Sequence, residues 1–228
     1  MALTNRDERV LAHIGLYRLS FRRILARLFF EGHPRACSNV LERLQKAGAL
    51  ESAPVGGGPL RYYRLTAAEA ARRGIPHRAG GFGSRALPEA IAVLWFATTS
   101  RRERHRLERN ELEELFGEHA PHGPHCLEDG NPPRVFRLYV PGPRTKPATV
   151  VATVRDLVAA AQHTSSLSSW LENGLYGFAV LVSSEARETR LRKAIDMADL
   201  STSATIVVAR TPDNASLGKA LHALIDSR

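Results

Sequence analysis

Three short amphipathic segments, followed by two strand-like runs around a Gly-Gly-Gly-Pro turn, constrain the first third of this chain most strongly. Apolar side chains recur at helical spacing in three successive segments between residues 4 and 48. The runs 49–52 and 60–65 then flank the turn at residues 56–59, which predicts a β-hairpin with a glycine tip. This order of elements predicts a winged helix-turn-helix domain within residues 1–75.

Capping residues and glycines predict where the helices of this domain begin and end. Ser20 is expected to cap the second helix, and Thr66 and Glu69 are expected to form a capping box on a short fourth one. The other predicted boundary residues are Thr4 or Asn5 and Gly15 for the first helix, Pro34 and Gly48 for the third, and Gly74 for the end of the fourth.

Positive charge is concentrated in this predicted domain. The formal net charge of the chain is +9. Residues 1–75 hold 13 Lys and Arg against 6 Asp and Glu, whereas residues 76–228 hold 19 against 17. A basic domain of this kind favours a polyanionic partner, and together with the helix order it predicts binding to double-stranded DNA.

The third helix is expected to lie in the major groove, with polar side chains facing the bases and phosphates. We expect Arg35, Asn39 and Arg43 to contact bases, with Ser38 and Lys46 beside them and His33 at the preceding turn. The predicted phosphate-contacting residues are Arg22, Arg23 and Arg27 on the second helix and Arg61 and Arg64 beside the hairpin. A solvated basic face, or a winged helix that contacts only protein as an adaptor, is the alternative.

Several segments of this domain resemble the replication-relaxation family of plasmid and mobile-element proteins. They are Leu3-Thr4-Asn5-Arg6-Asp7, Tyr17-Arg18-Leu19, Leu25-Ala26-Arg27-Leu28-Phe29-Phe30, the run from Leu41 to Leu50, and Tyr62-Tyr63-Arg64-Leu65-Thr66. The resemblance covers residues 3–74. It implies a sequence-specific DNA-binding protein that acts in plasmid replication or as an accessory factor in conjugative mobilisation, with a relaxase or replication protein as partner. The same motifs occur in transcription regulators, so a repressor is the alternative.

The rest of the chain predicts a linker and a second domain, which makes the expected fold class α+β. Residues 76–87 are rich in Gly and Arg and are expected to form a flexible linker. Strands at 135–140, 176–182 and 204–209 alternate with helices at 147–163, 184–198 and 215–225 within residues 88–228. This alternation predicts a small, partly parallel α/β domain, to which we assign homodimerisation or partner binding.

We expect no enzymatic activity from the second domain. The C-terminal part of the resembled family is often similar to a restriction-endonuclease-like fold, whose catalysis needs strand carboxylates and an acidic-x-Lys pair. Here the strand at 135–140 carries Arg137, and Glu128 and Asp129 are expected in a polar turn. The nearest downstream lysine, Lys146, is not two residues after an acid. The domain is therefore interpreted as a degenerate, non-catalytic one, and a metal-dependent nuclease is the less favoured alternative.

The sequence predicts neither a metal nor a cofactor. His119, His122, His125 and Cys126 lie within eight residues, but structural zinc sites usually draw ligand pairs from two separated segments, so we interpret them as an incidental histidine-rich loop. Cys37 and Cys126 are far apart and imply no disulfide. No membrane-spanning run or signal-peptide pattern is present, so a cytoplasmic location without a membrane partner is expected.

Overall fold

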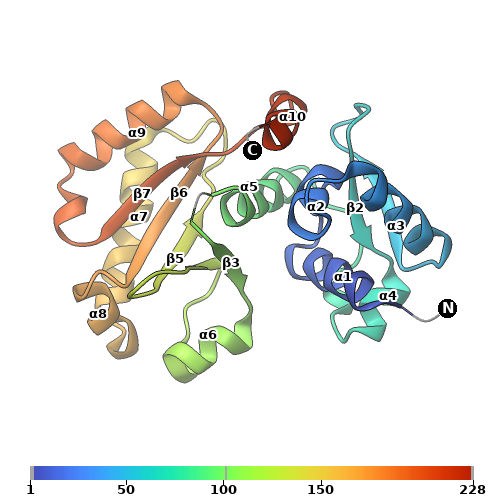
Figure 1. The fold of residues 1–228 in the computed structure, drawn as a ribbon. Coiled ribbons are helices and arrows are strands. Elements are labelled where there is room, and N and C mark those ends of the chain that lie inside the picture. The colour runs from blue at the N-terminus through green and yellow to red at the C-terminus, as the bar shows by residue number, and fades with distance from the viewer. Residues whose placement is uncertain (1–2, 101, 227–228) are drawn as a thin grey trace. The chain divides into compact units, whose positions relative to one another are not determined.

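The computed structural model describes residues 3–100 and 102–226. It is a mixed α+β structure with a five-stranded mixed sheet, which confirms the predicted class. The chain forms two compact units (Figure 1), of which the first is built from two separate stretches of sequence and the second from one. Unit 1 comprises residues 1–94 and 213–228, and unit 2 comprises residues 95–212. The predicted linker at residues 76–87 therefore does not separate the two units, because unit 1 continues to residue 94.

Unit 1 begins with helix α1, Asn5–Tyr17, which is capped as the sequence predicts. The Thr4 hydroxyl accepts a hydrogen bond from the Asp7 amide at 3.2 Å, and the Asp7 carboxylate accepts one from the Thr4 amide at 2.9 Å. The prediction that Gly15 ends this helix is wrong. Gly15 is buried inside α1, where a Cβ would lie 2.9 Å from the side chain of Ile75, and the helix instead ends at Tyr17 with Arg18 as its C-cap at φ 67°.

Helix α2, Arg22–Phe29, starts without the predicted serine cap. Its N-cap residue is Phe21, and no side chain caps the helix. Ser20 instead forms an isolated antiparallel bridge with Tyr63, in which the Ser20 amide donates to the Tyr63 carbonyl at 2.9 Å and the Tyr63 amide donates back at 2.8 Å. This bridge ties the connection between α1 and α2 to the hairpin.

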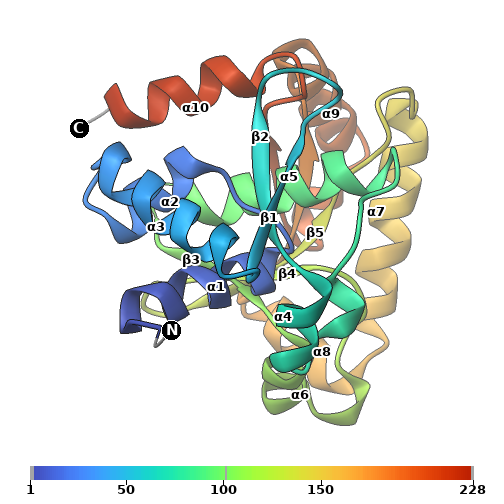
Figure 2. The ribbon, with the colours of Figure 1, turned by 90° about the vertical axis from the view of Figure 1, so that its right-hand side faces the viewer.

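Helix α3, Pro34–Lys46, has proline in its first turn, as predicted, and is followed by Gly48 with φ 71°. Strands β1, Leu50–Pro54, and β2, Arg61–Leu65, then form the predicted antiparallel hairpin (Figure 2). Apolar side chains of α1, α2, α3 and the hairpin share one core, which includes Leu11, Leu25 and Leu44.

Helix α4, Ala67–Arg72, forms only half of the predicted capping box. The Thr66 hydroxyl accepts from the Glu69 amide at 3.2 Å. The Glu69 carboxylate accepts hydrogen bonds from Arg72 and Arg73 instead, and the hydrogen bond from Arg72 is the main reason that the pKa of Glu69 is lowered. The return hydrogen bond to the Thr66 amide is replaced by an ion pair.

The segment predicted as a free linker packs on unit 1. It contains the 3-10 turn Pro76–Arg78, after which Phe82 contacts the Tyr62 ring edge-on. The Arg18 guanidinium lies 4.7 Å from the centre of the Phe82 ring. Two further helices belong at least in part to unit 1: α5, Ala86–Thr98, in which the division between the units falls, and α10, Leu217–Asp226. Helix α10, predicted within the second domain, packs against α2 (Figures 1 and 2).

Unit 2 is built on a five-stranded sheet in the order β3-β4-β5-β6-β7. The first three strands pair antiparallel and the last three parallel, as a partly parallel layer requires. The strands are β3, Arg104–Leu107; β4, His125–Glu128; β5, Arg134–Tyr139; β6, Tyr176–Val182; and β7, Thr205–Arg210. Strands β3 and β4 and helix α8 were not predicted.

Helices α7, Pro147–Gln162, and α9, Glu185–Met197, pack on each other and on one face of this sheet (Figure 1). Their core includes Val154, Phe178 and Leu191. Helices α6, Arg109–Phe116, and α8, Ser165–Glu172, complete the unit together with the 3-10 turns Gly117–His119 and Leu200–Thr202. No helix in the described part of the chain is both long and apolar enough to span a lipid bilayer.

Candidate functional site

The exposed face of α3 presents a row of polar side chains. Cys37, Leu41 and Leu44 turn into the core of unit 1, so the positions between them face outward. The exposed residues of this row are Arg35, Asn39, Glu42 and Lys46, spaced by three or four residues along the helix. Asn39, Glu42, Arg43, Lys46 and Ala47 line a shallow hollow of about 500 Å³ on this face. We call Arg35, Asn39, Glu42 and Lys46 the α3 row.

Three members of the α3 row are available to a ligand. Within the described residues, the side chains of Arg35, Asn39 and Lys46 make no hydrogen bond or ion pair. Arginine and asparagine can bond base edges in pairs, and lysine can neutralise a phosphate. The structure therefore brings these three predicted residues together on one open surface.

Arg43, predicted to contact bases, is held by a buried carboxylate. It forms an ion pair with Asp7 of α1, whose side chain is fully buried, while 38% of the Arg43 side chain stays exposed. A buried carboxylate needs such a partner. Arg43 therefore attaches α3 to α1, and only part of its guanidinium remains open to another partner.

The predicted phosphate contacts on α2 are also partly engaged within unit 1. Arg22 donates to the Ser38 hydroxyl at 3.3 Å, which joins α2 to α3. The Arg23 guanidinium lies 2.7 Å from Nδ1 of His222 on α10. Arg27 is half-buried and makes no hydrogen bond or ion pair within the described residues. Of the three, Arg27 alone has a guanidinium without a hydrogen bond there.

The hairpin carries its arginines along the strands and leaves the tip open. Arg61 donates to the hydroxyl of Ser52 at 3.0 Å and to its carbonyl at 2.7 Å, and Arg64 lies 2.9 Å from the carboxylate of Glu51. Residues 56–59 at the tip are exposed. Gly56 and Gly57 have φ values of 56° and 78°, which a side chain would disfavour. His33 is exposed at the N-cap of α3.

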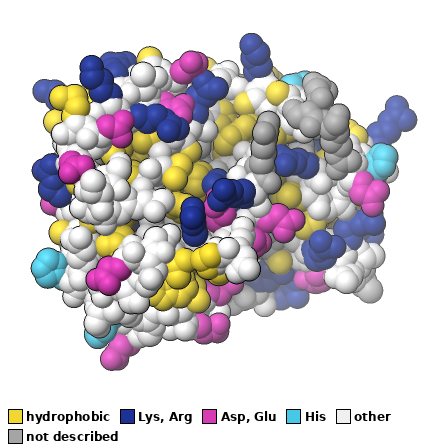
Figure 3. Space-filling model, turned by 60° about the vertical axis from the view of Figure 1, so that its left-hand side comes forward, with side chains coloured by type: hydrophobic (Ala, Val, Ile, Leu, Met, Phe, Trp, Pro, Cys, Tyr) yellow, Lys and Arg dark blue, Asp and Glu magenta, His cyan; other side chains and the backbone are white. Residues whose placement is uncertain are grey.

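Sequence reasoning missed two exposed arginines on α1. The Arg6 guanidinium lies 5.3 Å from the centre of the Phe30 ring, and that of Arg9 lies 5.4 Å from the Phe29 ring. Their spacing of three residues on one helix was the available signal. On the face of the molecule shown in Figure 3, Lys and Arg side chains are interspersed with Asp and Glu.

The histidine-rich segment of unit 2 does not gather its nitrogen and sulfur atoms. His125 and Cys126 are consecutive residues of β4 and so point to opposite faces of the sheet. Both are fully buried, whereas His119 and His122 are exposed. Burial raises the pKa of the Cys126 thiol to about 12, and the same effect raises that of Cys37 to about 12. The described residues contain no group of three or more His, Cys, Asp or Glu placed to hold a metal ion.

Glu128, predicted in a turn, is the last residue of β4. Its buried carboxylate accepts hydrogen bonds from Arg102 at 2.7 Å and from Arg104 at 2.8 Å. The hydrogen bonds from these two arginines lower the pKa of Glu128 against the opposing effect of burial, which is the largest single influence. A nuclease would need this carboxylate to bind a metal, and here it is already bound by two cations.

Comparison of the chain with protein-family models, with curated proteins and with solved structures finds no match.

Proposed function

We propose that unit 1 is a winged helix-turn-helix domain that binds double-stranded DNA through α3. The observation that carries this proposal is the α3 row, in which Arg35, Asn39 and Lys46 stand exposed and unpaired on one helix face. A helix of about 13 residues is long enough to lie in a major groove. The glycine-tipped hairpin and the Ser20–Tyr63 bridge support the same fold.

In this proposal the two ends of α3 have different tasks. Arg35 and Asn39, near the helix start, contact base edges. Lys46 and Arg27 contact phosphates, and the hairpin tip lies against the DNA backbone. Arg43 holds α3 on α1 through Asp7, so that the reading helix has a fixed orientation.

The biological role that we propose follows from the resemblance of residues 3–74 to the replication-relaxation family. The protein acts as an accessory factor in plasmid replication or conjugative mobilisation, with a relaxase or replication protein as partner. A homodimer would read two half-sites separated by one helical turn of DNA. A repressor would use the same surface, so that the flanking genes distinguish the two roles.

The experiment that tests DNA binding starts from a pool of random duplexes, from which the full-length protein selects preferred sites. Fluorescence anisotropy then gives the affinity for the selected duplex and for an unrelated duplex at several salt concentrations. We expect Arg35→Ala to weaken binding to the selected duplex about 10-fold or more and to reduce sequence preference. Lys46→Ala should weaken binding to both duplexes similarly and reduce the salt dependence by about one phosphate contact.

Arg85→Ala is the matched control, because Arg85 is exposed, lies in unit 1 and makes no side-chain ion pair within the described residues. It should change affinity little. Selection of no site, together with no binding to the unrelated duplex at low salt, would refute the proposal and favour the adaptor.

A further inference from the structure

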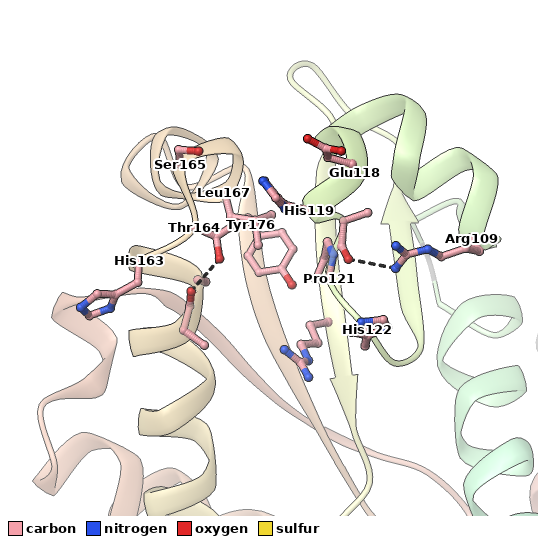
Figure 4. Close-up of a pocket in the computed structure, with 14 residues that line it drawn as sticks. Arg109, Glu118, His119, Pro121, His122, His163, Thr164, Ser165, Leu167 and Tyr176 are labelled. Carbon is pink, nitrogen blue, oxygen red and sulfur yellow. Dashed lines mark hydrogen bonds between the residues drawn. The ribbon is translucent and has the colours of Figure 1, made fainter.

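Unit 2 contains a pocket of about 560 Å³ that none of the residues discussed for DNA binding enters. It lies between the loop that carries His119 and His122 and the junction of α7 with α8, with Tyr176 of β6 between the two sides (Figure 4). His163 also borders the pocket, but its ring turns back to the Ala159 carbonyl at 2.7 Å. The pocket therefore has three sides: the sheet, the loop with His119 and His122, and the junction of α7 with α8.

Tyr176 lines the pocket on the side of the sheet, and its hydroxyl is held by His125, which is not among the lining residues. The Tyr176 hydroxyl lies 2.9 Å from Nε2 of His125, and Nδ1 of His125 lies 3.1 Å from the Gly123 carbonyl. Because a carbonyl can only accept, Nδ1 carries the proton, and Tyr176 donates its own to Nε2. Burial lowers the pKa of His125 to about 4 and raises that of Tyr176, so both stay uncharged at neutral pH.

Arg137 supplies a positive charge beside this pair. It lies opposite His125 on one side and Phe178 on the other in the strand register, so it shares their face of the sheet. It lines the pocket, is half-buried, and makes no hydrogen bond or ion pair within the described residues. Its charge also opposes protonation of His125. A half-buried guanidinium without an acidic partner is suited to an anionic ligand.

The start of α8 faces the same space with free donors. Thr164 occupies the N-cap position but does not cap the helix, because its hydroxyl donates to the Ala160 carbonyl at 2.9 Å. The amides of Ser165 and Ser166 have no acceptor among the described residues. An uncapped helix start of this kind favours a phosphate oxygen.

We infer that this pocket binds a small phosphomonoester, with its phosphate between Arg137 and the first amides of α8. His119 and His122 provide further N–H donors at the entrance, and the acidic lining residue, Glu118, is exposed. The volume of about 560 Å³ leaves room for an organic group attached to the phosphate. This chemistry is offered by a free nucleotide or by the 5′-phosphate at a DNA end.

Isothermal titration of the full-length protein with AMP, adenosine and inorganic phosphate tests this inference. We expect saturable binding of AMP, weaker binding of phosphate and none of adenosine. Arg137→Gln should weaken AMP binding about 10-fold or more, since it removes a charged hydrogen-bond donor. Arg134→Gln, which removes an exposed arginine from the same strand, is the matched control.

A second arm compares one duplex with 5′-phosphate ends and the same duplex with 5′-hydroxyl ends. A preference for the phosphorylated ends that Arg137→Gln removes, without AMP binding, identifies a DNA end as the source of the phosphate. The inference is overturned if neither AMP nor the phosphorylated ends bind in an Arg137-dependent way while the circular dichroism of Arg137→Gln is unchanged. That result would not bear on the α3 row, because the variants of Arg35 and Lys46 are measured by their binding to sites within a duplex and not to its ends.

Discussion

The two units bury the same kinds of group but partner them differently. Unit 1 satisfies its buried Asp7 with one arginine, Arg43, whose side chain is 38% exposed, whereas unit 2 satisfies its buried Glu128 with two, Arg104 at 14% and Arg102 at 65%. Gly15 of unit 1 approaches a flexible side chain, and Gly177 of unit 2 approaches a backbone carbonyl. The glycine comparison places the less adaptable arrangement in the sheet of unit 2, where neighbouring strands fix the backbone on both sides.

The largest loss of stability is expected when Glu128, the buried carboxylate of the sheet, is replaced. Glu128→Ala leaves the Arg104 guanidinium unpaired over the Phe96 ring, 4.0 Å from its centre, and should lower the free energy of unfolding by about 3 to 5 kcal/mol. Urea unfolding followed by tryptophan fluorescence measures this in unit 2, because Trp95 and Trp170 both belong to it. Glu103→Ala, at an exposed neighbouring position, should change it by less than about 0.5 kcal/mol.

The two glycines give the next largest contrast. A Cβ at Gly177 would lie 2.7 Å from the Thr205 carbonyl oxygen on the adjacent strand, so Gly177→Ala should destabilise unit 2 by about 3 kcal/mol. At Gly15 the obstacle is the side-chain end of Ile75, and alanine also favours a helix, so the expected change is below about 1 kcal/mol. If calorimetry shows that Gly177→Ala and Gly15→Ala lose the same stability, the proposed difference between glycine packing in the sheet and in the helix is wrong.

Arg43→Ala should have a smaller effect than Glu128→Ala, because Asp7 keeps its hydrogen bond from the Thr4 amide. We expect a loss of about 2 kcal/mol in unfolding free energy, measured by circular dichroism in urea. Arg35→Ala on the same helix is the control and should be nearly neutral. If Arg43→Ala is equally neutral, the ion pair does not stabilise unit 1, and Arg43 is free to serve the DNA alone.

The smallest expected effect is a dependence on pH that both units share. Burial lowers the pKa of His13 to about 3 and that of His125 to about 4, below the ordinary value of 6.5. The unfolded state therefore binds more protons, and stability present above about pH 6.5 is lost as the pH falls toward the folded values. As the pH falls from about 7.5 to 5.5, protonation of each histidine in the unfolded state should lower the free energy of unfolding by about 1 kcal/mol.

Urea unfolding at the two pH values measures this loss, with His13→Gln and His77→Gln compared. The first variant should reduce the pH dependence, while the second, at an exposed position, should leave it unchanged. A pH dependence that His13→Gln does not reduce would contradict a neutral, half-buried His13.

The sequence predicted the elements whose pattern is local. The run Tyr176–Val182 was predicted as a strand because its residues are apolar almost throughout, as in a strand that is buried on both faces. The spacing of the apolar residues in α3 predicted that the α3 row faces outward. Strands β3 and β4 were missed because they are short and rich in Arg, His and Cys. Helix α8 was missed because serines, which favour helix ends and turns, fill half of its eight positions.

Partners distant in sequence could not be predicted in the same way. Asp7 looked like an ordinary acidic residue in the first turn of a helix, and only the fold brings Arg43 to it from 36 residues away. Arg137 was considered only as a missing carboxylate, because the strand register and the start of α8 that give it a pocket are tertiary features. Periodicity shows which side of an element is buried but not what covers it.

The packing of α10 on α2 has a consequence for how the protein is made. Helix α10 follows the whole of unit 2 in the sequence, so it is synthesised after every residue of that unit. The surface of α2 that α10 covers therefore stays open until unit 2 has been synthesised. The unit that begins to form first is completed only after the second one has been made.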